Sequence, residues 1–421
     1  MKASLGFVCP LFLFLSILYS FPVYADDNAT LSALKLADNT AFDATKYPSL
    51  NVFAESAISA SQYQKHPTQR FSLDTRWDSP VLPQFFRHWR FMISHRFDQY
   101  FSHRMHHNCS VSSLREAYVS VQPTPQMLLN FGRINTRYGV AFSYNPTDFL
   151  GQGTTRKVDS GDPDMRRFNR LGNAMLQLQH LWARASVTTM ISPSLKHYSG
   201  NSRTGFNWQA SNPANRLLVV ASYQMTENFN PQVLFFQEQH QSPQVGLNMS
   251  VVLSRSTLAY LEAAGGKQTA AWEHIVPGSS QARTWRNRIA LGATWTGDSH
   301  QTLRIEGYYN EAADSRRVRR TLSSLPYYAF RGKKSGQHLT DGMTSRRAVL
   351  AQIFWKDIVD QYDVNLLWQH DLQQHLNTGF MELRRHLGPV DIAVQWQKNI
   401  EMKNYVTRPD QIWRLSANYY F

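Results

Sequence analysis

Several arginines occupy alternate positions of extended stretches. Of all side chains in this sequence, they have the clearest capacity to bind a ligand. A guanidinium stays charged at physiological pH and carries five N–H donors, so it holds a carboxylate or phosphate at two points. Where such groups line a water-filled passage, they favour anions. The competing interpretation is that they pair with neighbouring acids, chiefly Glu306, and only rigidify a wall. Five arginines stand opposite apolar faces in this way: Arg286, Arg288, Arg304, Arg384 and Arg414.

A second group of charges lies in the segment between residues 136 and 171. A stretch of about 35 residues without regular structure is usually either functional or disordered. We expect it to fold into the passage as a constriction, where opposed acids and bases select solutes by size and charge. The alternative is a solvated outer loop. The candidate constriction residues are Asp148, Asp159, Asp162, Asp164, Arg166, Arg167 and Arg170.

Metal binding and catalysis have weaker support. His103, His106, His107 and Cys109 stand close together, and imidazole and thiolate bind zinc or copper. Without a second ligand pair elsewhere, we predict neither a metal site nor any other cofactor. Residues 197–201, His-Tyr-Ser-Gly-Asn, faintly resemble the His-x-Ser-Asn-Gly stretch of outer-membrane phospholipases, in which His activates a Ser nucleophile. An inserted glycine breaks that spacing, so the sequence predicts no catalytic residues.

The elements that position these side chains show most clearly at the end of the chain, over residues 411–421. Side chains of a strand alternate between its two faces. Here the apolar and polar faces are Trp413, Leu415, Ala417, Tyr419 and Phe421 against Arg414, Ser416 and Asn418. An apolar face suits lipid, a polar face suits a water-filled lumen, and aromatic side chains suit the membrane interfaces. The pattern therefore predicts a transmembrane β-barrel.

Two resemblances support this architecture. The chain end resembles the C-terminal strand of Gram-negative outer-membrane β-barrel proteins, whose terminal Phe is part of an assembly signal, which implies that the barrel-assembly machinery recognises Phe421. The stretch 131–149 joins a Gly-Arg strand, a Gly-containing loop and an Asn-Pro-x-Asp turn, and it is similar to a pattern in several porin-like families. Asn-Pro followed by a short acid forms turns. We expect this motif to shape a loop more than to touch solute.

The same alternation recurs along the chain and gives a strand count. Both chain ends of such a barrel lie in the periplasm, so the number is even, and short periplasmic turns alternate with long outer loops. We expect about 16 antiparallel strands in up-and-down order, with 14 and 18 left open, and a barrel of that size leaves a water-filled lumen. The parity depends on treating 192–214 as one loop. The expected strands are 86–98, 112–121, 126–135, 172–182, 184–191, 215–225, 231–238, 243–254, 256–264, 283–295, 301–310, 347–356, 361–370, 378–387, 389–398 and 411–421.

The N-terminal region differs from the rest. Residues 1–25 have a basic start, an apolar run and a small-residue cleavage pattern, so we interpret them as a secretory signal peptide. Residues 26–84 are rich in Ala, Ser, Asn and Asp, and we expect a periplasmic or plug segment there, followed by the barrel at 85–421. No later stretch has the roughly 20 apolar residues that a spanning helix requires. We therefore expect the cell outer membrane as the location.

The formal charge of +14 at pH 7 narrows the partners. For an exported barrel, phosphates of lipopolysaccharide and anionic solutes fit a basic chain better than nucleic acid does. We expect an outer-membrane channel for small polar solutes, anions above all, without enzyme activity. Two alternatives stay open. One is a barrel that exports an acidic polymer or metabolite with an inner-membrane partner, like alginate-export barrels, and the other is a non-conducting barrel, plugged by residues 26–84, that serves assembly, adhesion or lipid chemistry.

Overall fold

The computed structural model describes residues 49–62, 66–79, 88–101, 109–151, 154, 162–197, 204–269, 283–313, 346–359, 361–373, 375–401 and 411–421. The expected signal peptide lies outside these residues. Strands make up most of the described chain, and the two helices, α2 (Pro163–Phe168) and α3 (Trp208–Ser211), are short. No helix in this part of the chain is long and apolar enough to cross a membrane.

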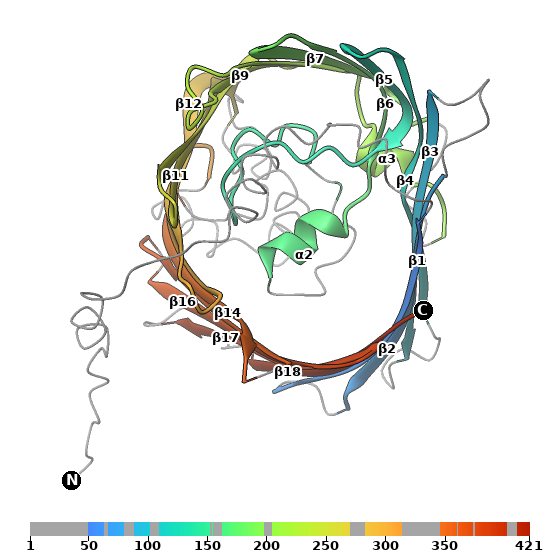
Figure 1. Ribbon diagram of the computed structural model, residues 1–421, viewed down its shortest axis with the longest axis vertical. Coiled ribbons are helices and arrows are strands. Elements are labelled where there is room, and N and C mark those ends of the chain that lie inside the picture. Colours follow the sequence, from blue (N-terminus) through green and yellow to red (C-terminus); the bar gives the residue numbers. More distant parts are fainter. Residues whose placement is uncertain are drawn as a thin grey trace, which may run out of the picture.

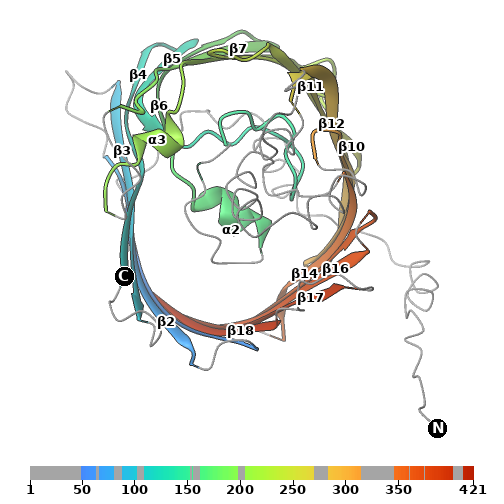
Figure 2. The same cartoon turned by 180° about the vertical axis from the view of Figure 1, so that it is seen from behind.

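Eighteen antiparallel strands form one closed barrel (Figure 1), and Figure 2 shows the same ring from behind. Each strand pairs with its neighbours in sequence, and β1 pairs with β18 to close the ring. Closure removes the unpaired edges that lipid does not tolerate. The strands are β1 (Ser49–Ser61), β2 (Thr68–Asp78), β3 (Trp89–Phe101), β4 (Cys109–Thr124), β5 (Met127–Ile134), β6 (Asn173–Leu181), β7 (Ala185–Ser192), β8 (Arg216–Tyr223), β9 (Gln232–Glu238), β10 (Gln244–Ser254), β11 (Thr257–Gln268), β12 (Thr284–Thr296), β13 (Gln301–Asn310), β14 (Arg347–Ile358), β15 (Tyr362–Asp371), β16 (Leu376–Leu387), β17 (Val390–Glu401) and β18 (Gln411–Tyr420).

The number of strands is 18, one of the two alternatives to the expected 16 that the sequence left open. All sixteen expected strands are present, and the two additional ones, β1 and β2, lie within the segment 26–84. The barrel therefore does not begin at residue 85, and residues 49–61 and 68–78 are wall and not plug. The physical reason is weak contrast between the faces of β1, which carries Ser56 and Ala60 beside Ile58 on its outward face and Phe53 and Ala57 on its inward face.

The two faces of the wall differ as a membrane requires. On β12, Leu291 is 55% exposed, whereas the adjacent Ala290 is fully buried. On β13, Ile305 is 57% exposed and the adjacent Glu306 is buried. Exposed large apolar side chains thus point outward along the strands, and polar or small side chains point into the barrel. This arrangement matches lipid outside and a polar lumen inside.

The lengths of the links orient the barrel. At one end, residues 125–126, 255–256 and 388–389 join their strands in tight turns. At the other end, the links include the long segments 135–172 and 193–215. Short turns face the periplasm in bacterial outer-membrane barrels. The chain end at Phe421 lies on the side of the short turns, as the sequence predicts.

Gly132 allows the close pairing of β4 and β5, and its replacement gives the first testable prediction. Its φ is +136°, and a Cβ there would lie 2.7 Å from the Cα of Tyr118. We expect Gly132→Ala to lower the free energy of unfolding by roughly 1–3 kcal/mol, because strained backbone and crowding add. Urea titration of the refolded barrel measures this. Gly307→Ala is the matched control, since a Cβ at Gly307 meets nothing within 4 Å. Equal midpoints for the two variants would contradict the prediction.

Candidate functional site

The segment between β5 and β6 lies inside the barrel. In Figure 1 it runs in cyan to green through the interior, with α2 inside the ring of strands. Its described residues are 135–151, 154 and 162–172, and we call them the inward segment. The expectation that this segment folds into the passage is confirmed, because its backbone is hydrogen-bonded to lumen-facing side chains of β11 and β13.

Glu262 on β11 is the first of two buried carboxylates that hold the inward segment. Its Oε1 accepts the backbone N–H of Thr147 at 2.7 Å and the hydroxyl of the same residue at 2.9 Å. Its Oε2 accepts the backbone N–H of Ala141 at 3.1 Å and the side-chain amide of Asn145 at 3.2 Å. Both oxygens are therefore occupied by donors of one tight turn, and they replace the partners that irregular backbone lacks.

Glu306 on β13 is the second buried carboxylate that holds the inward segment. Its Oε1 accepts the backbone N–H of Phe142 at 2.5 Å and the hydroxyl of Tyr260. Its Oε2 accepts the backbone N–H of Ser143 at 3.1 Å and the hydroxyl of Tyr308. The two phenols orient the carboxylate, so that both of its oxygens face the inward segment from a fixed position on the wall.

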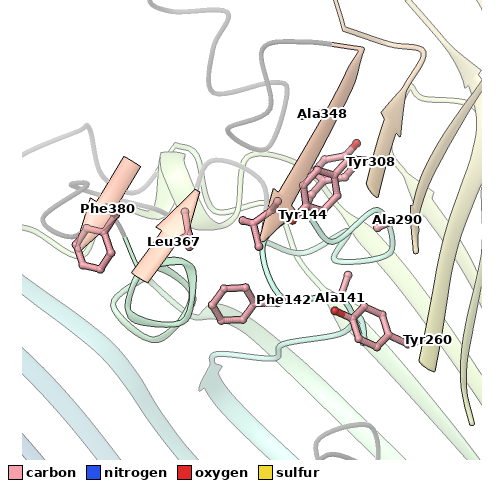
Figure 3. Packing of buried hydrophobic residues seen from close by; sticks show 10 residues of the cluster. Ala141, Phe142, Tyr144, Tyr260, Ala290, Tyr308, Ala348, Leu367 and Phe380 are labelled. Carbon is pink, nitrogen blue, oxygen red and sulfur yellow. The ribbon is translucent and has the colours of Figure 1, made fainter. Parts of the chain in front are cut away.

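Apolar packing completes the attachment. Figure 3 shows Phe142 and Tyr144 of the inward segment in one cluster with wall residues that include Tyr308 and Leu367. The rings of Tyr144 and Tyr308 meet edge to face, with centroids 6.0 Å apart. Further along, Phe149 stacks on a ring of β9 at 4.8 Å. Aromatic contacts of this kind add to the area that they bury, so the segment is docked along its length.

The Asn-Pro-x-Asp stretch forms the expected turn. The backbone N–H of Asp148 donates to the carbonyl of Asn145 at 3.2 Å. The carboxylate of Asp148 pairs with Arg170, which also donates to the Oδ1 of Asn135 at 2.8 Å and to the carbonyl of Thr136. Two residues of the candidate constriction set thus join the two ends of the inward segment to each other.

Arg133, the arginine of the Gly-Arg strand, also shapes loops. It donates to the carbonyl oxygens of Gly172 and Phe206, each at 2.9 Å, and to the hydroxyl of Ser211 at 3.2 Å. Its guanidinium lies over the ring of Trp208, 4.6 Å from the centroid. These contacts connect β5 to the start of β6 and to α3, which agrees with the loop-shaping interpretation of the motif.

The rest of the candidate constriction set is only partly placed. Arg167 donates to the carbonyl oxygens of Ala141 at 3.3 Å and Tyr138 at 3.1 Å. Burial lowers the pKa of Arg166, and Asp162 opposes that effect. Asp164 belongs to α2, with its side chain outside the described part of the structure, and Asp159 lies outside the described residues.

A cluster of guanidinium groups gathers where the inward segment meets β2 and β4. Arg167 and Arg170 donate to the carbonyls on either side of Arg137 and so flank it. Arg137 itself lies over the ring of Phe168, 5.7 Å from the centroid. Burial, and then the charge of Arg167, lower its pKa, and Arg170 and Arg76 of β2 add to this repulsion. We call Arg76, Arg137, Arg167 and Arg170 the basic cluster.

Two members of the basic cluster keep their N–H groups available. Among the described residues, neither Arg76 nor Arg137 has a hydrogen bond or an ion pair. The acid in electrostatic contact with Arg137 is Glu116, against three neighbouring cations. Sequence reasoning missed both residues. Arg137 lies inside the recognised motif but was not chosen, and Arg76 lies in the segment that was expected to form a plug.

All five wall arginines face the lumen, but they differ in their partners. Arg286 donates to two backbone carbonyls, and Arg288 donates to the side-chain oxygen of Gln244 at 2.8 Å. Arg304 donates to the side-chain oxygen of Gln352 at 2.8 Å and lies 3.9 Å from the ring centroid of Phe142. The groups that accept these hydrogen bonds are neutral.

Of the other two wall arginines, Arg384 pairs with acids, Glu382 at 2.9 Å and Asp391 at 3.5 Å. Arg414 donates to the hydroxyl of Ser59 at 3.1 Å across the seam between β18 and β1, and to the side-chain oxygen of Gln395 on β17 at 3.4 Å. The geometry of Arg384 therefore agrees with the competing interpretation from the sequence, in which the wall arginines pair with acids.

A buried ion-pair network lines β1 to β4. Arg115 pairs with Asp74, and each side chain is about 2% exposed. Arg96 pairs with Glu55 at 2.9 Å and with Asp98 at 3.0 Å. Arg115 also donates to Asn169 at 3.0 Å and so reaches the end of the inward segment. This network involves β1 and β2, and the sequence interpretation that omitted these strands could not find it.

The described residues contain no group of His, Cys, Asp and Glu side chains that could hold a metal ion. Cys109 is a half-buried free thiol at the start of β4. The three histidines before it lie outside the described chain, as does Ser199 of the stretch that is similar to phospholipases.

Comparison with known proteins finds similarity at the level of structure. No family model and no curated protein matches the sequence. Among solved structures, OccAB1 of Acinetobacter baumannii is 8% identical, with a TM-score of 0.53 over 89% of this chain and 96% of that one. OprD of Pseudomonas aeruginosa is 10% identical, with a TM-score of 0.51 over 95% and 99%. OccK5 (OpdH) of Pseudomonas aeruginosa is 7% identical, with a TM-score of 0.53 over 89% and 98%. At such identities the likeness shows the fold alone.

Proposed function

We propose that this closed 18-stranded barrel is an outer-membrane channel for small polar solutes and that it favours anions. The observation that carries the proposal is the basic cluster, in which Arg76 and Arg137 make no hydrogen bond or ion pair with the described chain, although Glu116 is in electrostatic contact with Arg137. Both arginines belong to the region where the inward segment meets β2 and β4. An anion there exchanges its water shell for N–H donors that need no rearrangement.

The contacts of acidic side chains in the lumen also support a preference for anions over cations. Glu262 and Glu306 have both oxygens occupied by donors that hold the inward segment. Glu382 and Asp391 face Arg384. Arg304 donates to the neutral side chains of Thr294 and Gln352. A passing cation therefore meets these four carboxylates already engaged, whereas a passing anion meets the guanidinium of Arg304 without an acid bonded to it in the described chain.

Ion selectivity in planar bilayers tests the proposal. In a salt gradient, the reversal potential of the refolded channel should show anion preference. In Arg76→Gln and Arg137→Gln, we expect the anion-to-cation permeability ratio to fall about fivefold per charge, if each contributes about 1 kcal/mol in a wet lumen. Arg385→Gln is the matched control, because Arg385 lies over the ring of Tyr362 on the outward face and loses the same charge.

The outcomes distinguish the proposal that the barrel is a channel from the proposal that the channel favours anions. A conducting barrel with unchanged selectivity in both variants would leave a channel but remove the basic cluster as its selectivity element. The double variant Arg286→Gln with Arg288→Gln then tests the wall of β12. A folded barrel that conducts no ions would contradict the channel itself.

A further inference from the structure

Three basic side chains stand on the outward face of the wall at its outer end, on neighbouring strands from β14 to β17 (Figure 1). Arg347 begins β14, next to the buried, lumen-facing Ala348. His370 lies two residues after Trp368 of β15, which is 47% exposed. The register of β16 and β17 places Lys398 on the same face. We call Arg347, His370 and Lys398 the rim cations.

No acidic side chain stands beside the rim cations on the outward face that the structure describes. On β14, Asp357 lies at the periplasmic end. Every acid whose side chain is described on β15 to β17 is at a lumen-facing position: Asp363, Asp371, Glu382 and Asp391. Among the described residues, none bonds to the ammonium of Lys398. This part of the outward face is therefore positively charged, and it attracts anions from outside the chain.

The rim cations lie at the level of lipid head groups. Lys398 follows Val390, the first residue of β17 on the periplasmic side, by eight residues. At about 3.3 Å per residue and a strand tilt of about 40°, Lys398 lies about 20 Å above that end, near the upper edge of an apolar band about 25 Å tall. His370 is one residue from the outer end of β15. The short turns face the periplasm, so this edge of the band faces the outer leaflet.

Aromatic side chains hold two of the rim cations in place. The ring of His370 stacks on Trp368, with centroids 5.8 Å apart, and its Nδ1 lies 2.8 Å from the Oδ1 of Asn377. The guanidinium of Arg347 lies over the ring of Tyr309, 5.8 Å from the centroid. Trp and Tyr rings suit the boundary between hydrocarbon and head groups. The charges are thus positioned at this boundary by the wall itself.

The wall is low directly below Arg347. Two residue pairs along β13 and β14, Gly307 pairs with Val349 on one side and with Leu291 of β12 on the other. A Cβ at Gly307 would meet nothing within 4 Å, and Leu291 is 55% exposed. An acyl chain can lie against Gly307 between these two side chains. A lipid whose head group contacts the rim cations therefore also finds room for a chain.

We propose that the rim cations bind the phosphorylated head group of lipopolysaccharide. Three steps between neighbouring strands separate Arg347 from Lys398, which is about 14 Å at about 4.8 Å per step. A phospholipid brings one phosphate, which does not reach both ends of such a row. The head group of lipopolysaccharide carries several anionic groups on a frame of sugars, so one molecule can contact all three cations. Arg347 holds a phosphate at two points, and Lys398 acts as a point charge. The site lies outside the wall and does not depend on whether the lumen conducts.

Titration of the refolded, detergent-solubilised full chain with a short-chain lipopolysaccharide tests the proposal, with native mass spectrometry as the readout. We expect a saturable complex with the parent barrel. The dissociation constant should rise about fivefold in Arg347→Gln and about fivefold in Lys398→Gln, since each removes one cation near the head groups. Arg385→Gln is the matched control, because Arg385 is outward-facing and loses the same charge at the periplasmic end of β16. Its dissociation constant should equal that of the parent.

Two further ligands keep the test decisive without any substitution. Dephosphorylated lipopolysaccharide should bind the parent barrel at least fivefold more weakly, and phosphatidylglycerol should not displace the intact form. A parent barrel with folded gel mobility that binds no lipopolysaccharide would overturn the proposal, as would an equal loss of affinity in Arg385→Gln. If phosphatidylglycerol competes as well as lipopolysaccharide does, the rim cations attract any anionic lipid and the proposed recognition of lipopolysaccharide is wrong.

Discussion

Glu262→Ala is expected to release the inward segment from the wall and to raise the single-channel conductance. The change removes the acceptor of four hydrogen bonds from Ala141, Asn145 and Thr147 at once. Hydrogen bonds to a charged acceptor contribute about 1.5–3 kcal/mol each. Two of the four at the lower value already shift the docked-to-undocked ratio by roughly a hundredfold. Conductance of single channels in planar bilayers measures the effect, with larger and noisier current steps as the expected result.

The design of the controls follows from the geometry. Glu262→Gln should behave like the alanine variant, because both carboxylate oxygens accept hydrogen bonds and an amide nitrogen cannot accept one. Glu382→Gln loses the same charge from the lumen wall, but the contacts of Glu382 are with Arg384 and Gln395, not with the inward segment. Its conductance should stay near that of the parent channel. If all these variants conduct alike, Glu262 does not hold the constriction.

The second large effect is expected on stability. In Arg115→Leu, the carboxylate of Asp74 stays buried with Arg96 at 3.6 Å as its remaining cation. Breaking a buried pair in this way costs about 3–5 kcal/mol of unfolding free energy. The leucine also cannot donate to Ser94 and Asn169, which lie 3.1 and 3.0 Å from the guanidinium. Unfolding in urea, followed by the gel mobility of the folded barrel, measures the loss.

A double variant distinguishes a charge effect from a packing effect. Asp74→Leu with Arg115→Leu removes both charges, so its loss of stability should be smaller than the sum of the two single losses. Arg385→Leu, on the outward face, should change stability little. Strict additivity of Asp74→Leu and Arg115→Leu would mean that the two side chains stabilise the barrel independently.

Much of the fold follows from the period of two along the chain. Residues 285–295 and 411–421 show how outward aromatic and aliphatic side chains mark a strand without any knowledge of its partners. β2 carries the same signal in Phe71, Leu73 and Trp77, so it could have been found. β1 does not, because apolar residues stand on both of its faces, Leu50 and Ile58 outward and Phe53 inward, and its assignment comes from pairing with β2 and β18.

The site was less predictable, for a different reason. Arg288 and Arg384 follow the same local pattern, yet one has a neutral partner and the other has two acids. Which of these occurs depends on strands that are distant in sequence. The roles of Glu262 and Glu306 depend on a loop more than a hundred residues away and have no local signature. Composition therefore predicted a lumen with charged side chains, but not which of them are engaged in ion pairs and hydrogen bonds within the barrel.

The attachment of the inward segment has a consequence for the order of assembly. Ala141 and Glu262 are 121 residues apart, and Phe142 and Glu306 are 164 apart. Contacts over such separations form only after the intervening chain has been organised, because closing long loops costs entropy before any contact rewards it. The inward segment therefore finds its two carboxylates only when β11 and β13 are in place. The lumen therefore takes its final shape late, after the first thirteen strands of the wall have been organised.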